Sequence, residues 1–416
     1  MHHHPIFFRN FEAAFKPFKT ILVMKKLLLS IIALIALATG ARAQEENMNT
    51  TPLSLEAVED GTVVTLTNNN SAVVKFALRT YTAPGEYTDD VWYTVQDKNT
   101  INLNAGDILV LRSTCKDQSG NFKILASKDV YVYGNPLSLV SQTDYASRTD
   151  LSDCADGVLQ ELFSNGWDGN PHIKNHPTKD IVLPATTLSN SCYYKMFMGT
   201  GLTRAPQLPA MTLTNSCYNY MFFGCKSLTE APALPSTTLA DECYYAMFYG
   251  CSSLATAPEL PATTLAYECY GNMFRDCISL TAAPVLPAPK PDMDSYYWMF
   301  YGCKNLTYVK CLATDISASS CTNNFLGNVS PTGTFVKADG MEDWTRDYNG
   351  VPEGWTIINA SEETTAIGEI ENEKTNLYNN NVYDLQGRRM LSPHTSHLTP
   401  LKKGVYIVNG KKTVIR

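Results

Sequence analysis

The sequence predicts a repeat solenoid in which each rung of about 26 residues holds one short helix and one short strand. A small β-sandwich is predicted before the solenoid and a small β-domain after it. Three observations favour this fold class. Met-Phe pairs recur every 25 or 26 residues, Leu-Pro pairs keep the same interval, and both flanks alternate apolar and polar residues between turn residues. With 416 residues, 44% of them hydrophobic, the chain is long enough for several domains.

Two landmarks define the repeat units. The Met-Phe pairs begin at Met196, Met221, Met247, Met273 and Met299, and the Leu-Pro pairs begin at Leu183, Leu208, Leu234, Leu260 and Leu286. A degraded sixth copy keeps the interval at Leu312 and Leu326. A fixed period of roughly 20–50 residues is typical of stacked supersecondary units.

Positions are numbered here from the Phe of each Met-Phe pair, which is position 0. Residues at −5, −1, 0 and +3 would share one face of an α-helix, as Cys243, Met247, Phe248 and Cys251 do. The Gly at +2, for example Gly250, would end that helix. The Leu-Thr-x-Ala-Pro-x-Leu stretch that follows predicts an extended strand. Because one such unit cannot bury its own apolar face, neighbouring rungs are expected to stack.

The repeat cores resemble a known family. The C-Y-x-x-M-F-x-G-C-x-S-L segments at 217–228 and 243–254 resemble the BspA-like leucine-rich repeats of secreted Bacteroidetes surface proteins. Thr200 and Ser295 depart from the pattern because they replace cysteines, and Pro-Lys-Pro replaces Thr-Thr-Leu at 289–291. The resemblance implies a surface interaction protein of the adhesin type, although a repeat fold by itself does not specify a ligand.

The flanks complete a predicted domain order. The predicted segments before the repeats are an upstream extension and signal peptide at 1–43, a β-sandwich-like module at 44–135, and a linker with an N-terminal capping repeat at 136–182. Within the last of these, a short helix is predicted from Asp156 to Phe163. The repeats at 183–333 are followed by a C-terminal cap at 334–358, a linker at 359–376 and a β-unit at 377–416. The last unit is similar to the C-terminal sorting domains of type IX secretion substrates. A plain β-hairpin tail is the alternative.

The N-terminal segment predicts export. Met24 with two following lysines, the apolar stretch 27–38 and the small residues before Gln44 have the form of a secretory signal peptide cleaved after Ala43. Twelve residues are too few for a membrane span of about 20. We therefore expect a protein at the cell surface or outside the cell, associated with the outer membrane through sorting rather than through a transmembrane helix.

No motif predicts catalysis or a cofactor. The net charge of −7 argues against a nucleic-acid partner. The His172 and His176 pair has helical spacing, but Pro171 and Pro177 flank it, so we interpret it as a solvated loop and expect no metal site. The protein is predicted not to be an enzyme. Two alternatives stay open: an extracellular hydrolase or enzyme-associated module with its site outside the repeats, and a structural spacer.

The 12 cysteines are predicted to be thiols. Positions −5 and +3 both hold cysteine in some repeats, as with Cys217 and Cys225, but Cys192 faces Thr200 and Ser295 faces Cys303. A disulfide that mattered would lose both members together. Eight residues of helix also separate Cα atoms by about 12 Å, beyond the reach of a bridge.

An aromatic ladder predicts the binding surface. Positions −3 and +1 are four residues apart and would lie on one line beside the buried helix face. The candidate ligand-binding residues on this line are Tyr194, Phe223, Tyr245, Tyr249, Tyr297 and Tyr301. Such rings suit a glycan or a host surface or matrix protein. The alternative is that they pack on neighbouring rungs and only seal the side. Binding requires exposed rings, whereas a hydrolase would show a deep pocket with at least two carboxylates.

Overall fold

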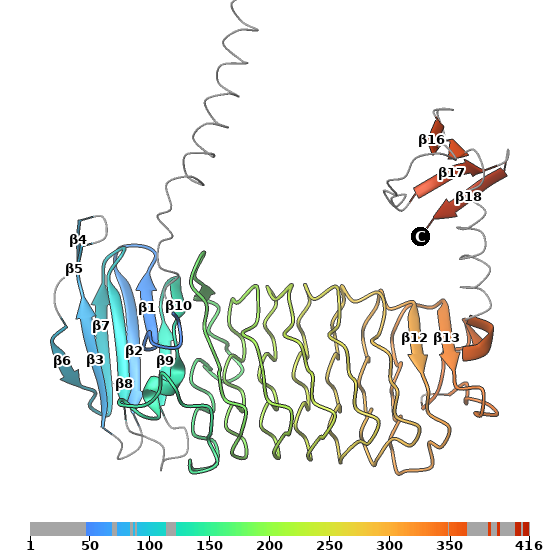
Figure 1. Ribbon diagram of the computed structural model, residues 1–416, viewed down its shortest axis with the longest axis horizontal. Helices are drawn as coiled ribbons and strands as arrows, with labels where there is room; N and C mark the ends of the chain where they lie inside the picture. The colour runs from blue at the N-terminus through green and yellow to red at the C-terminus, as the bar shows by residue number, and fades with distance from the viewer. Residues whose placement is uncertain are drawn as a thin grey trace, which may run out of the picture. The chain divides into compact units, whose positions relative to one another are not determined.

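The computed structural model describes residues 47–68, 73–83, 86–87, 90–113, 122–347 and 349–363, and the strands at 382–383, 389–391, 404–408 and 411–415. Within these ranges the chain is built from strands and turns, with only two short helical segments. A β-module comes first in the chain, and a row of stacked rungs follows it (Figure 1). The predicted signal peptide lies outside the described residues. No described helix is long and apolar enough to cross a membrane.

The β-module consists of two sheets. The larger has the order β11-β10-β1-β8-β3-β6 and contains β1 (Ser54–Ala57), β3 (Val74–Arg79), β6 (Trp92–Thr94), β8 (Ile108–Ser113), β10 (Val130–Tyr133) and β11 (Ile173–Asn175). The smaller joins β7 (Lys98–Leu103), β2 (Thr62–Asn68) and β9 (Phe122–Ala126), and a separate hairpin pairs β4 (Tyr81–Ala83) with β5 (Glu86–Tyr87). Alternate side chains of β2, such as Val64 and Leu66, are fully buried. The alternation predicted from the sequence therefore places one face of β2 in the core.

The β-module continues directly into the first rung. Strand β11 pairs with β10 in parallel, and η1 (Pro136–Leu139) follows β10 and donates its Ser138 hydroxyl to the Leu111 carbonyl of β8 at 2.9 Å. The backbone N–H of Ile124 in β9 donates to the carbonyl of Leu162 at 2.9 Å. The buried Asn170 amide donates to the carbonyls of Ile124 at 2.9 Å and Phe163 at 3.1 Å. Backbone and side-chain hydrogen bonds thus join the module to the repeats.

Each rung contains a run of overlapping four-residue turns. At odd offsets from the Phe, the N–H donates to the carbonyl three residues earlier, as Met247 does to Tyr244 at 3.2 Å. At even offsets the N–H donates to the next rung, as Phe248 does to Met273 at 2.9 Å. Every fourth residue has a positive φ, for example Glu242, Ala246 and Gly250 at 55°, 50° and 73°. These residues reverse the chain and direct the alternate N–H groups to the neighbouring rung.

The predicted fold class is wrong in its central element. No rung contains a helix, so the structure is not a solenoid of helix-plus-strand leucine-rich repeats. A helix requires negative φ at every residue and bonds each N–H to the carbonyl four residues earlier. Here the repeated positive φ at −6, −2 and +2 excludes a helix. Two neighbouring side chains are buried at −5 and −4 and again at −1 and 0. This interval of four residues resembles the helical period of 3.6 in the sequence.

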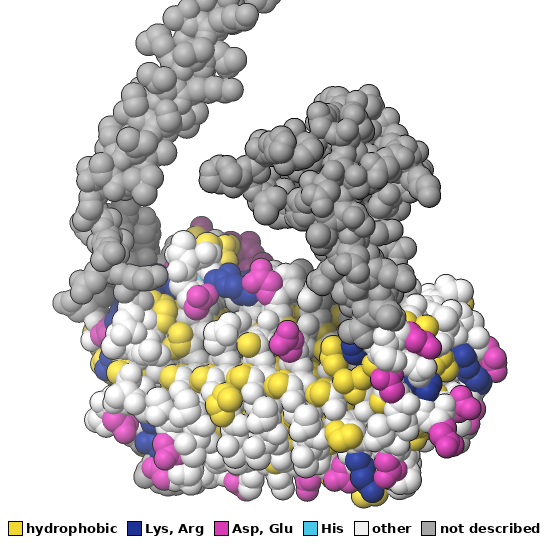
Figure 2. All heavy atoms as spheres, turned by 45° about the vertical axis from the view of Figure 1, so that its right-hand side comes forward, with side chains coloured by type: hydrophobic (Ala, Val, Ile, Leu, Met, Phe, Trp, Pro, Cys, Tyr) yellow, Lys and Arg dark blue, Asp and Glu magenta, His cyan; other side chains and the backbone are white. Residues whose placement is uncertain are grey.

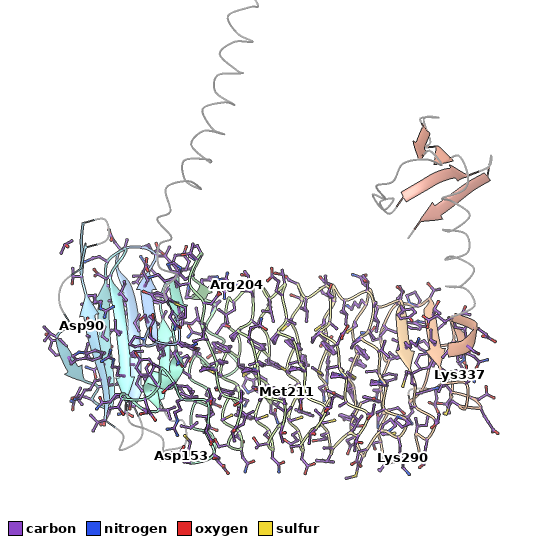
Figure 3. The ribbon with its side chains drawn as sticks, in the orientation of Figure 1. Asp90, Asp153, Arg204, Met211, Lys290 and Lys337 are labelled. Atoms are coloured by element: carbon purple, nitrogen blue, oxygen red, sulfur yellow. The ribbon has the colours of Figure 1, made fainter. Side chains whose placement is uncertain are left out.

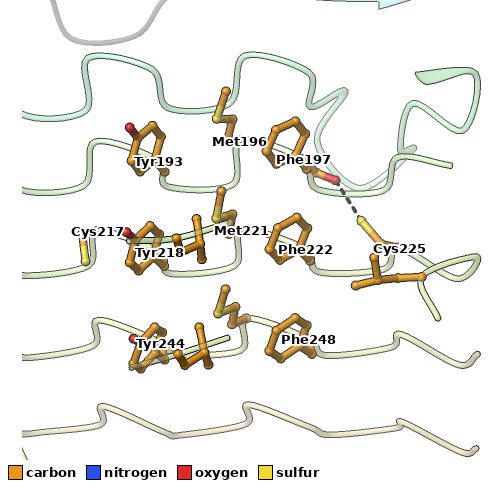
Figure 4. Packing of buried hydrophobic residues seen from close by; sticks show 14 of the residues in the cluster. Tyr193, Met196, Phe197, Cys217, Tyr218, Met221, Phe222, Cys225, Tyr244 and Phe248 are labelled. Atoms are coloured by element: carbon orange, nitrogen blue, oxygen red, sulfur yellow. Dashed lines mark hydrogen bonds between the residues drawn. The ribbon is translucent and has the colours of Figure 1, made fainter. Parts of the chain in front are cut away.

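Buried side chains form columns along the stack. The Phe column runs through Phe163, Phe197, Phe222, Phe248, Phe274 and Phe300 with ring centres 5.5 to 5.8 Å apart, and a Tyr column at −4 runs beside it. Across a single rung, Cys217 and Cys225 lie at opposite ends of the buried side chains, with Tyr218 and Phe222 between them (Figure 4). All eleven described cysteines are buried and free, and Cys115 lies outside the described residues.

The thiols at +3 take part in the stacking. Cys225 donates its S–H to the carbonyl of Phe197 at 3.0 Å, and Cys251 donates to that of Phe222 at 3.1 Å. Thr200, which replaces a cysteine, donates its hydroxyl to Phe197 at 2.9 Å instead. Position +3 therefore holds a small donor that reaches a backbone carbonyl, and the helical distance argument is not the reason these cysteines are unbridged.

The segment predicted as the N-terminal capping repeat has the same turn conformation as the repeats. The segment from Asp156 to Phe163, predicted as a short helix, is another turn rung, with positive φ at Gly157 and Glu161. Its Phe163 N–H donates to Met196 at 3.0 Å, and the two rings of Phe163 and Phe197 stack at 5.5 Å. The helix prediction for 156–163 is wrong for the same reason as in the other rungs.

Two further sheets are formed by strands in the C-terminal part of the chain, β12 (Tyr308–Cys311) of the first of them lying before the turn rung at 320–328. Strands β12, β13 (Gly333–Lys337) and β14 (Trp355–Asn359) form a parallel sheet, and a short helix at 360–363 follows β14. Trp355 donates its indole N–H to the Ser330 carbonyl at 2.8 Å. In the predicted β-unit, β15 (Val382–Tyr383), β16 (Arg389–Leu391), β17 (Gly404–Val408) and β18 (Lys411–Ile415) form an antiparallel sheet of order β16-β15-β17-β18.

Candidate functional site

The turn geometry directs alternate pairs of side chains away from the core on one side of each rung. Positions −5 and −4 and positions −1 and 0 point into the core, as Cys243, Tyr244, Met247 and Phe248 show. Positions −3, −2 and +1 fall between these buried pairs, on the outer side of the turn ribbon. The sequence predicted −3 and +1 for this line on the basis of a helix. The turns add position −2, which the helix did not identify.

All six predicted ligand-binding residues lie on this side, and each is intermediate between exposed and buried, so the predicted requirement of exposed rings is met only in part. Tyr194, Tyr245 and Tyr297 at −3 are half-buried, and so are Phe223, Tyr249 and Tyr301 at +1. The ladder is interrupted at Met198 and Asn219, which are buried at 1% and 3% exposure. Part of each aromatic ring therefore packs on a neighbouring rung, and part faces solvent.

Three aromatic residues that the sequence argument missed complete the surface. Trp167 is 74% exposed and contacts Phe223 edge to face at 5.2 Å between ring centres. Tyr220 and Trp298 occupy position −2, where Tyr220 meets Tyr245 at 5.4 Å. We define the aromatic face as Trp167, Tyr194, Tyr220, Phe223, Tyr245, Tyr249, Tyr297, Trp298 and Tyr301. Position −2 was detectable from the repeat alignment, whereas Trp167 lies outside the aligned repeats.

Two cations connect the rings of the aromatic face. Lys195 Nζ lies 4.8 Å from the Tyr194 ring centre and 5.3 Å from that of Tyr220. The Arg275 guanidinium carbon lies 4.9 Å from the Tyr249 ring and 4.3 Å from the Trp298 ring. Arg275 stands at +1, where the rungs before and after it hold Tyr249 and Tyr301. It connects the rings on its two sides, because a guanidinium packs on aromatic faces.

A groove of about 380 Å³ runs beside the aromatic face. The rings of Tyr194, Tyr220 and Tyr245 line it on one side. On the other side are the residues at position −6 of four successive rungs, which are Ser191, Ser216, Glu242 and Glu268. Because one side is aromatic and the other polar, the groove offers both stacking and hydrogen bonding to a ligand.

Hydrogen bonds hold part of the polar side of the groove in place. Asn219 Nδ2 donates to Glu242 Oε2 at 3.0 Å, and the Ser216 hydroxyl lies 3.3 Å from the same oxygen. Burial raises the pKa of Glu268, and the negative charges of Glu242 and Asp294 raise it further. Burial raises the pKa of Tyr245 as well. The groove therefore concentrates negative charge in a partly desolvated place.

Other charged side chains are paired away from this groove. Figure 3 places Arg204 and Lys290 at opposite edges of the stacked rungs, where they contact Asp180 at 2.7 Å and Asp315 at 2.9 Å. Figure 2 shows a band of hydrophobic side chains along the rungs on one face, with charged side chains gathered mainly toward its edges. Paired edge charges of this kind contribute little to stability.

The two histidines of interest contact the β-module. The His172 Nδ1 lies 2.9 Å from Asp129 Oδ1. His176 packs edge-on against Tyr131 and Tyr133, and its Nδ1 accepts the Lys179 N–H at 3.0 Å. The side chain of His176 is only 14% exposed, so the interpretation of this segment as a solvated loop is wrong for His176. Within the described ranges no three His, Cys, Asp or Glu side chains form a group suited to a metal ion.

Comparisons of the chain with known protein families, curated proteins and solved structures find no match. The resemblance to BspA-like surface proteins therefore stays a prediction from the sequence, and the candidate function rests on the geometry of the aromatic face and the adjacent groove.

Proposed function

We propose that the protein is a non-catalytic binding protein of the cell surface or extracellular space, and that the aromatic face is its contact surface. The observation that carries the proposal is the continuity of this face. Rings from four turn rungs and Trp167 contact one another directly or through Arg275, which belongs to the rung of Phe274. Half-buried rings are held in place by their neighbours, so they present area to a partner at little entropic cost.

The expected partner is a host surface or matrix protein or a glycan. Tyrosine and tryptophan dominate the energetics of many interfaces because they combine a broad apolar surface with a polar tip. The adjoining groove adds amide, hydroxyl and carboxylate groups, which fix the orientation of a ligand. The signal peptide and sorting-domain predictions support an extracellular location.

The test is an array of glycans and matrix proteins probed with the purified chain. Tyr245→Ala with Tyr249→Ala is expected to weaken the best array interaction by roughly tenfold or more. Met211→Ala is the matched control, because Met211 is an exposed apolar residue, at 55%, outside the aromatic face. If the double variant retains binding but loses more than about 3 kcal/mol of stability, the rings seal the stack rather than bind.

One observation favours a hydrolase as a second candidate. Glu242 and Glu268 line the same groove, and the pKa of Glu268 is raised by burial, as a general acid requires. This candidate site lies within the repeats, whereas the sequence argument expected a hydrolytic site outside them. A panel of chromogenic glycosides separates the two functions. Turnover that Glu268→Gln abolishes supports the hydrolase, and a binding protein gives none.

A further inference from the structure

The groove beside the aromatic face is rich in hydrogen-bond acceptors. Asn219 is 3% exposed, and its Oδ1 has no partner among the described residues. The Asn219 Nδ2 donates to the Glu242 carboxylate, which fixes the orientation of the amide and leaves Oδ1 as the acceptor. A buried acceptor without a partner costs about 1–3 kcal/mol. The groove therefore favours an occupant that donates hydrogen bonds.

Three carboxylates occupy one position in consecutive rungs. Glu242, Glu268 and Asp294 all stand at −6, and none of them forms an ion pair with a described residue. Stacked like charges in a partly buried row repel one another. These three do not form a group suited to a metal ion. A cationic organic group laid along the row would relieve the repulsion without needing a metal's tight geometry.

The aromatic side of the groove already shows how such a group is held. Lys195 Nζ rests near the Tyr194 and Tyr220 rings, which both line the groove. Arg275 rests between Tyr249 and Trp298 on the same face. An ammonium and a guanidinium from the chain itself therefore bind rings of the aromatic face, and the same chemistry serves a ligand.

The rung spacing suits an extended peptide. Neighbouring Phe rings stack 5.6 to 5.8 Å apart, so equivalent side chains of successive rungs repeat at about that distance. Side chains on one face of an extended peptide repeat at about 6.6–6.8 Å. Two basic residues separated by one residue would thus reach the carboxylates of adjacent rungs.

Taking the proposed binding function as given, we propose that the groove binds an extended peptide segment of a partner protein through alternate Lys or Arg side chains. Each cation lies between a carboxylate at −6 and a tyrosine ring at −3 or −2. The Asn219 carbonyl oxygen accepts a hydrogen bond from one of these cations or from a peptide N–H. A neutral oligosaccharide is the competing occupant.

The experiment measures fluorescence anisotropy of a labelled peptide with alternating Lys and Ser, against the same peptide with acetylated lysines. Tight binding of the charged peptide alone, weakened when NaCl rises from about 50 to about 500 mM, supports the proposal. Glu242→Gln with Glu268→Gln keeps the size and the acceptor of each side chain and should weaken binding by about tenfold or more. Equal affinity for both peptides overturns the proposal.

The matched control is Glu230→Gln with Glu259→Gln, which removes two exposed carboxylates outside the groove. If this control weakens binding as much as the groove variant does, attraction is merely to net charge and the proposal fails. A neutral oligosaccharide that binds, and that only Tyr245→Ala with Tyr249→Ala weakens, overturns the peptide but keeps the proposed binding function. If no aromatic variant weakens binding of the peptide or of the oligosaccharide, the aromatic face is not a binding surface.

Discussion

The β-module and the turn rungs use the same backbone groups in two different ways. In β2, N–H and carbonyl groups alternate between β7 and β9, and side chains alternate singly between core and surface. In a rung, alternate N–H groups close turns or reach the next rung, and side chains are buried in pairs. About half of the backbone N–H groups in the turn segment of a rung therefore depend on the neighbouring rung for their hydrogen bond.

The largest effect is expected from Phe248→Ala. Its fully buried ring stacks between Phe222 at 5.8 Å and Phe274 at 5.6 Å, so its loss should cost about 3–5 kcal/mol in urea denaturation. Hydrogen exchange should rise in the rungs on both sides, because their N–H groups depend on one another, while β2 and β8 stay protected. Leu66→Ala in the β-module is the control. Equal loss of protection in both regions after Phe248→Ala contradicts the comparison.

An intermediate effect is expected at alkaline pH. Burial raises the pKa of Cys217 and of Cys269 from 9.0 to about 12, so both thiols are neutral in the folded protein. A thiol with a raised pKa stabilises the fold fully below pH 9, and that contribution is lost as the pH rises from 9 to about 12. The urea midpoint should fall over this window, and more steeply than in Cys217→Ala.

The described strands of the β-module contain no cysteine, so their exchange protection should survive alkali longer than that of the rungs. A mass spectrum of the unreduced protein provides the control, since all eleven described thiols should react with an alkylating reagent after unfolding. Bridges between −5 and +3 within rungs, or a urea midpoint that does not change with pH, would contradict this account.

The smallest effect is expected at position +2. Gly250 has φ of 73°, and a Cβ there would lie 3.7 Å from Gly224, an ordinary contact. Gly250→Ala should therefore cost about 1 kcal/mol through its backbone conformation alone. Asp276 stands at the same position with φ of 58°, so Asp276→Gly should gain about 0.5–1 kcal/mol. Changes of the same sign in thermal denaturation would show that φ does not control this position.

The alternation at 62–67 allowed the β-module to be predicted, because a period of two corresponds to one regular structure. The rungs were predicted wrongly, because pairs buried every four residues resemble a helix. The residues whose positive φ excludes a helix are not of types that predict a positive φ. Position −2 has positive φ at Lys195, Tyr220, Ala246 and Trp298, and side chains of these types seldom adopt it. Backbone bonds to the next rung hold them there, and no single repeat reveals those bonds.

The candidate site was predicted in part. Repeat alignment identified the rings at −3 and +1, since stacking in register brings equivalent positions together whatever the local conformation. It did not identify Asn219 and Glu242 as partners, because they belong to different rungs and different offsets. Their contact depends on the backbone bonds that shift each rung by one residue relative to the next, as from Phe248 to Met273.

Within the turn segments, from −6 to +2, the bonds between rungs all point the same way along the stack. At each even offset the N–H faces the following rung, and the carbonyl of the same peptide unit faces the preceding one. The dipoles of these peptide units therefore add, as they do along an α-helix, but across rungs rather than along one continuous helix. The partial negative end lies at the first rung, where the Ile124 N–H meets the Leu162 carbonyl, and the partial positive end lies toward the rung at 320–328. The stack thus has an electrical polarity, by which anions are favoured at its C-terminal end and cations at its N-terminal end.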